Sequence, residues 1–137
     1  MNPPVPRRSP LTAWIGWSAF TTAALVLATV VAQPVWAGLF LTGDIGMLAA
    51  HQQGANLATL VLVVDLVLRI LWWSPCRGPA LGVWLNLALT AALYIQYVLG
   101  QDRLLQFHFP LGVGLSLLSA WLVVHSWRSV RRIGGAA

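Results

Sequence analysis

The stretch Tyr94–Gly114, YIQYVLGQDRLLQFHFPLGVG, decides the fold because it joins two long apolar segments through a short polar turn. The first segment ends just beyond Gln96, the turn covers residues 100–103, and the next apolar segment opens at His108. Short connections place consecutive helices side by side. The stretch therefore predicts two adjacent helices, with a glutamine near the end of one and a histidine at the start of the other.

An earlier stretch repeats this order. Gln33 closes an apolar segment, residues 41–50 form a loop with glycines and one aspartate, and His51 opens the next segment. The repetition predicts two similar helix pairs, with both glutamines and both histidines near one level.

The composition predicts an integral membrane protein. Of the 137 residues, 58% are hydrophobic and 8% are charged, whereas soluble domains contain about 25% charged residues. A soluble fold of this size keeps a large share of its surface in water and could not bury so many apolar side chains. Lipid is therefore the expected solvent.

Four apolar segments are long enough to cross a hydrocarbon layer of about 30 Å, which needs roughly 20 helical residues. We therefore expect an all-α membrane protein, an antiparallel bundle of four transmembrane helices. The expected organisation is a tail at 1–10, a transmembrane domain at 11–128 with spans at about 11–40, 51–73, 80–99 and 108–127, and a basic tail at 129–137.

The first apolar segment has a second interpretation as a signal peptide. Arg7-Arg8 would be its charged region, and Val35-Trp36-Ala37 would be a cleavage site of the small-x-small kind. The apolar run before that site exceeds the usual length of about 7–15 residues, which favours an anchored first helix.

The arginines predict the orientation. The chain contains no lysine, so arginine is its only basic residue apart from histidine. Six arginines lie in the two tails and the 74–79 loop, whereas the two opposite loops contain only Arg103. By the positive-inside rule, both termini are expected in the cytoplasm, as in a multi-pass protein of the plasma (bacterial inner) membrane. Because the arginines form no patch with interleaved aromatic residues, a nucleic-acid partner is not expected. Tryptophans near the cytoplasmic ends suggest an interfacial belt: Trp14, Trp17, Trp72, Trp73, Trp84 and Trp127.

Each histidine heads a stripe of residues on one helix face, because a helical residue turns about 100°. The first stripe is His51, Ala55, Ala58, Leu62, Asp65 and Arg69, and the second is His108, Gly112, Leu115, Ser119, Leu122 and Ser126. The small residues one turn below the histidines, Ala55 and Gly112, leave room for a flat cofactor or allow the helices to touch.

Two neutral imidazoles facing each other across a bundle are suitable axial ligands for haem iron. His51 and His108 are therefore the expected metal ligands of one haem b near the outer leaflet. Gln33 and Gln96 lie at the right depth to fix the imidazole tautomers or to bond the propionates. Polar helix starts without any ligand are the alternative interpretation of the two histidines.

The residues Ile95–Gly100 and His108–Gly112 resemble the second helix pair of a half-bundle in the heme A synthase family. That family consists of two four-helix halves, each with a histidine on its second and fourth helices that holds a haem. The chain is similar to it over roughly residues 33–118, and also to small four-helix bacterial membrane proteins. The resemblance implies that His51 and His108 are haem ligands. The chain differs at Gln52, where the family typically has arginine, and its outer loops lack the family's glutamate and cysteine pair.

Asp65 and Arg69 are the charged residues expected inside the membrane. Each charge costs about 2.5–3.5 kcal/mol at mid-membrane on insertion scales, so both need partners. Their spacing of four residues predicts an intrahelical ion pair. The pair either locks the bundle together with Asn86 or serves as a proton or ion relay.

Three functions remain open from the sequence: a haem-b protein for electron transfer or haem handling, a non-catalytic accessory or assembly subunit of a larger complex or homo-oligomer, and a small transporter or relay at Asp65 and Arg69. No nucleotide-binding loop, nucleophile triad or zinc spacing occurs, and no catalytic residue is indicated. The single cysteine, Cys76, forms no CxxC pair. His125 is expected at the interface, off the stripe of His108.

Overall fold

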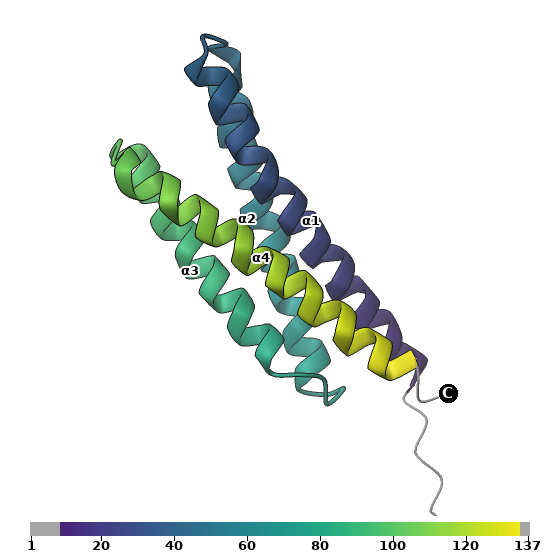
Figure 1. Cartoon of the computed structure of the whole chain (residues 1–137). Helices are drawn as coiled ribbons and strands as arrows, with labels where there is room; N and C mark the ends of the chain where they lie inside the picture. The colour runs from purple at the N-terminus through teal and green to yellow at the C-terminus, as the bar shows by residue number, and fades with distance from the viewer. Residues whose placement is uncertain (1–8, 135–137) are drawn as a thin grey trace, which may run out of the picture.

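The computed structural model describes residues 9–134, with side chains up to residue 132, and contains four helices and no strand within that range (Figure 1). They are α1 (Pro10–Leu41), α2 (Gly46–Trp73), α3 (Leu81–Gln101) and α4 (Leu105–Gly134). Each is long and apolar enough to cross a membrane. The expectation of an all-helical chain with four candidate spans is confirmed for this part of the chain. Residues 1–8 and 135–137 of the expected tails lie outside the described residues.

Two helices extend beyond the expected spans. α2 begins at Gly46, before His51, because residues 47–50 are Met, Leu, Ala and Ala, which favour helix. α4 runs from Leu105 to Gly134, through most of the segment expected to be a basic tail. Pro110 lies inside this helix, in its second turn, where proline removes one intrahelical hydrogen bond. Arg131 and Arg132 occupy its last turn, where positive charge is favourable.

Side-chain chemistry at the helix ends fits the observed boundaries. Ser9 is the N-cap of α1, and its hydroxyl accepts a hydrogen bond from Thr12 N at 3.4 Å. Pro10 follows at the first helical position, where proline is well tolerated. In the turn after α1, Gly43 has a φ of 110°, a conformation that glycine adopts without a steric penalty.

The four helices enclose a common apolar core. α2 lies against α1 and α3, and α4 lies against α3 and α1, which places α2 and α4 at opposite corners. The main cluster takes residues from every helix: Ala23, Val26, Val30, Leu62, Leu85, Leu89, Leu115 and Leu122. Most other large apolar side chains are exposed, as expected for surfaces in contact with lipid.

The two ends of the molecule differ. The start of α1 and the end of α4 lie side by side, with the rings of Trp17 and Trp127 centred 5.9 Å apart (Figure 1). The α1–α2 and α3–α4 turns stand apart at the other end. His51 and His108 lie toward those turns, so this is called the histidine end below.

Candidate functional site

The two histidines of the repeated helix pairs lie close together. His51 is in α2 and His108 is in α4, and their ring centroids are 6.2 Å apart with 56° between the ring planes. Both side chains are half-buried. Because α2 and α4 occupy opposite corners, the two imidazoles meet across the centre of the bundle. The sequence expectation that they share one level agrees with this distance.

Each histidine contacts the backbone of the glutamine on the preceding helix. His51 Nδ1 lies 3.2 Å from the carbonyl oxygen of Gln33, and His108 Nδ1 lies 3.0 Å from that of Gln96. The Nδ1 of His51 also lies near the side-chain amide of Gln33. The Nδ1 of His108 has only the carbonyl oxygen as its partner, and a carbonyl oxygen can only accept, so in this ring we assign the proton to Nδ1 and the lone pair to Nε2. A metal-ligating histidine usually has this arrangement, with its second nitrogen donating to a carbonyl group.

The two glutamine side chains differ in their surroundings. The Gln33 amide fits best with its nitrogen 2.9 Å from His51 O and its oxygen 3.1 Å from Ala55 N, an orientation that also puts the nitrogen 3.0 Å from His51 Nδ1. It is therefore attached to the first turns of α2. Gln96 Oε1 is buried and has no hydrogen-bond partner among the described residues. The backbone carbonyls can hold the imidazoles without either amide.

Small residues below the histidines permit this close packing. A Cβ added at Gly54 would collide with the Trp36 ring and would lie 2.5 Å from the Gln33 amide. A Cβ added at Gly112 would lie 3.1 Å from Gln96 Nε2. Gly54 therefore has the role in α2 that Gly112 has in α4, whereas Ala55, the expected counterpart, is half-buried beside it.

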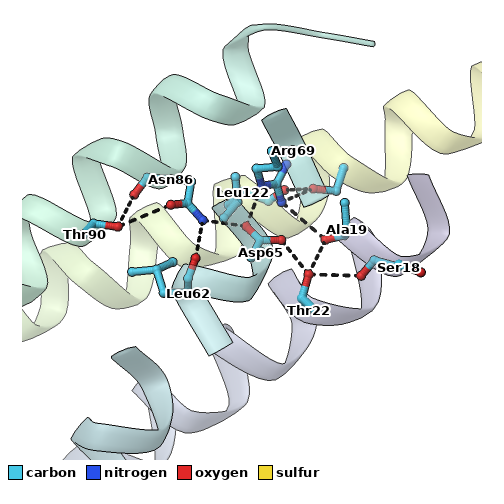
Figure 2. A network of polar contacts seen from close by, with 10 residues as sticks. Ser18, Ala19, Thr22, Leu62, Asp65, Arg69, Asn86, Thr90 and Leu122 are labelled. Carbon is cyan, nitrogen blue, oxygen red and sulfur yellow. Dashed lines mark hydrogen bonds and ion pairs between the residues drawn. The ribbon is translucent and has the colours of Figure 1, made fainter. Parts of the chain in front are cut away.

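A second polar group lies deeper in the bundle, around the ion pair of α2 (Figure 2). Arg69 Nε lies 2.5 Å from Asp65 Oδ2, and both side chains are at most 1% exposed. Thr22 of α1 donates to Asp65 Oδ1 at 2.6 Å, and Asn86 of α3 donates to Asp65 Oδ2 at 2.7 Å. Each carboxylate oxygen therefore has a donor from a neighbouring helix, and Oδ2 also has the Arg69 donor of α2 itself.

The guanidinium extends the network to α4. Arg69 Nη2 donates to Ser126 Oγ at 2.9 Å and lies 3.4 Å from the carbonyl oxygen of Ala19. Asn86 also donates to Leu62 O at 3.1 Å. Side chains of all four helices thus share one buried network (Figure 2). Arg69 Nη1 is buried and has no partner within the described part of the chain.

Trp72 differs from its expected position, and His125 has one buried ring nitrogen. Trp72, expected in the interfacial belt, is 1% exposed, because Gly16 and Gly78 leave space for its indole. A Cβ at either glycine would lie about 3 Å from the ring, at 3.1 Å and 2.7 Å respectively. His125, expected at the interface, is half-buried, and its Nε2 is buried without a partner among the described residues.

Several residues of these sites were not singled out in the sequence. They are Trp36 and Gly54 beside Gln33, Thr22 beside Asp65, and Gly82, which lies against Arg69. The spacing of a buried charge indicates its own helix face, but not which hydroxyl of another helix reaches it. Glycines inside apolar helices were the available signal for Gly54 and Gly82.

The chain matches no family model, no curated protein and no solved structure in the three comparisons made. The resemblance to the heme A synthase family therefore stays a prediction from the residues quoted above.

Proposed function

We propose that this protein is an integral membrane protein that binds one haem b between His51 and His108, for electron transfer or haem handling. The supporting observation is the matched pair of imidazoles, with centroids 6.2 Å apart and with each Nδ1 on a backbone carbonyl. Two metal–nitrogen bonds of about 2.0–2.1 Å, with about 1 Å from each nitrogen to its ring centre, require about 6 Å.

The number of ligands favours a macrocycle over a bare ion. Among residues 9–132, no group of three or more His, Cys, Asp or Glu side chains comes together. A structural zinc ion usually needs four protein ligands, whereas haem iron needs only the two axial positions from the protein. The bound group would supply one-electron chemistry. The chain's own part is to fix the two rings and to surround them with apolar helices.

The surroundings of His108 can make room for a flat group. Gln96 lies against Gly112, but its buried Oε1 has no partner, so few contacts oppose its displacement.

Absorption spectroscopy tests the proposal. The purified full chain should show a Soret band and sharp α and β bands on reduction, as six-coordinate low-spin haem does. His51→Ala and His108→Ala should each remove or weaken these bands. His125→Ala is the matched control, since His125 is also half-buried and lies on α4 with His108. A well-folded protein that stays colourless after haem is added would refute the proposal.

We further propose an antiparallel bundle in the plasma membrane with both termini cytoplasmic and the histidine end outside. The contacts Gly16–Trp72 and Thr22–Asp65 support opposite directions for α1 and α2. Between these two contacts the residue number rises in α1 and falls in α2. In a Cys76→Ser background, Asp44→Cys and Asp102→Cys should react with a membrane-impermeant thiol reagent from outside. The natural Cys76 should not react in intact cells, and its labelling would reverse the orientation.

A purely structural role, as an accessory subunit, is the second candidate, and the buried network favours it over a relay. Asp65 accepts hydrogen bonds from three side chains, and both side chains of the ion pair are buried. Buried hydrogen bonds between helices usually stabilise helix packing. If Asp65→Asn folds normally but abolishes function in cells, a proton or ion relay at Asp65 would replace both the haem-binding and the accessory-subunit proposals.

A further inference from the structure

The exposed surface of α2 carries three side-chain amides for which the described chain offers no partner. Gln52, Gln53 and Asn56 are exposed, and none of the three side chains makes a hydrogen bond within residues 9–132. Thr59, exposed nearby, differs because its hydroxyl bonds Ala55 O at 2.9 Å. Amides without partners are costly in hydrocarbon.

The depth of these amides follows from α3. Its 21 residues span about 31 Å, close to the thickness of the hydrocarbon layer of about 30 Å, and we therefore place the two boundaries of the layer at its ends. Asn86 is bonded to Asp65 and therefore sets the level of α2. The level of Asn56 can be counted along α2 from Asp65, or from His51, which lies level with His108 and Gln96. The two counts place Asn56 about 9–15 Å inside the boundary at the histidine end. This depth is too great for contact with lipid headgroups.

Two of the amides, Gln53 and Asn56, belong to a regular seam. Gln53, Asn56, Leu60, Val63, Val67 and Ile70 alternate in spacing between three and four residues, and all six are exposed. This heptad spacing keeps one helix face turned toward a partner helix along its length. Leu60 and Val67 are 62% and 52% exposed, so the apolar part of the seam is as uncovered as the polar part.

We propose that this seam is the interface of a homodimer in which α2 pairs with α2 of a second copy. Copies inserted with one orientation place their α2 helices parallel, so each seam residue meets its own counterpart. Amides suit such self-pairing because each contains both donors and acceptors, whereas like charges would repel. Asn56 then pairs with Asn56 of the second copy and Gln53 with Gln53, and the valines and Leu60 pack below them. The dimer does not depend on haem binding.

Cysteine cross-linking in native membranes tests the interface in the full chain, with Cys76→Ser as background. Asn56→Cys should form a disulfide-linked species of twice the 14.8 kDa chain mass. Val113→Cys is the matched control: Val113 follows His108 by five residues, as Asn56 follows His51, and it is 62% exposed on α4. Val113→Cys should stay monomeric. Equal cross-linking at both positions, or linkage of Asn56→Cys to a different protein, would overturn the proposal.

A second measurement separates dimerisation from chance collision. Energy transfer between donor-labelled and acceptor-labelled copies, followed while lipid is added to vesicles, gives the dissociation constant. Asn56→Leu, which cannot form the amide pair, should raise it by about 3- to 20-fold, the range of measured interhelical hydrogen bonds in membranes. Asn56→Gln should stay near the wild-type value. A wild-type chain that is monomeric at every dilution, or no effect of Asn56→Leu, would contradict the interface.

Discussion

Gly82 of α3 lies directly against the guanidinium of Arg69 in α2, so that a Cβ added at residue 82 would be 2.6 Å from Nη1. The guanidinium cannot move aside freely, since its Nε is bonded to Asp65 and its Nη2 to Ser126. The contact explains why α3 can approach α2 at the level of the buried ion pair.

Gly82→Ala should therefore destabilise the protein by about 1–3 kcal/mol, the usual cost of adding a methyl group to a closely packed interior. Thermal unfolding in detergent measures the change. Gly114→Ala is the control, since nothing lies within 4 Å of its added Cβ. Because alanine favours helix over glycine by about 0.5–1 kcal/mol, this control should be neutral or slightly stabilising. Equal effects of both substitutions would contradict the close contact at Gly82.

Asp65→Ala should be the most damaging substitution in the network. It leaves the Arg69 charge buried without its counter-ion, which typically costs about 3–5 kcal/mol. Thr22→Val removes one interhelical bond, the 2.6 Å bond to Asp65 Oδ1, together with the hydroxyl's contacts to the carbonyl oxygens of Ser18 and Ala19 in its own helix. It should cost about 0.6 kcal/mol, the mean for interhelical hydrogen bonds in membranes. Unfolding in a denaturing detergent, followed by tryptophan fluorescence, compares the two. Similar losses would mean that the ion pair contributes little.

The sequence predicted the inward faces of the helices well, because a turn of 100° per residue leaves little choice. Ala58, Leu62, Asp65 and Arg69 of the first stripe are all buried, as the position of His51 implied. The same rule could not decide between Gly54 and Ala55, since adjacent residues share the interface and a small rotation of α2 exchanges them. Trp72 was misjudged because burial of an indole depends on space left by Gly16 and Gly78, which are distant in sequence.

Gln96→Ala should leave the orientation of His108 nearly unchanged. The imidazole is bonded to the backbone carbonyl of residue 96 at 3.0 Å, and any residue supplies that group. If haem binds as proposed, the wavelengths of its reduced α and β bands should be retained. Loss of the low-spin spectrum in Gln96→Ala would show that the amide itself holds the ligand. Gln33→Ala is the variant to compare with Gln96→Ala, because the Gln33 amide, unlike that of Gln96, contacts the backbone of His51 and Ala55.

Gly112→Leu should exclude the proposed haem while leaving the bundle folded. Residue 112 lies one helical turn beyond His108 on the same face, and a Cβ there would meet only Gln96 Nε2, at 3.1 Å. A leucine side chain would therefore displace Gln96 and occupy the space that a macrocycle next to His108 requires. Gly114→Leu adds the same volume on the same helix where nothing lies within 4 Å. The ratio of Soret absorbance to protein should fall strongly for Gly112→Leu only, with equal far-UV circular dichroism in both variants. Full haem content in Gly112→Leu would contradict the position of the cofactor between α2 and α4.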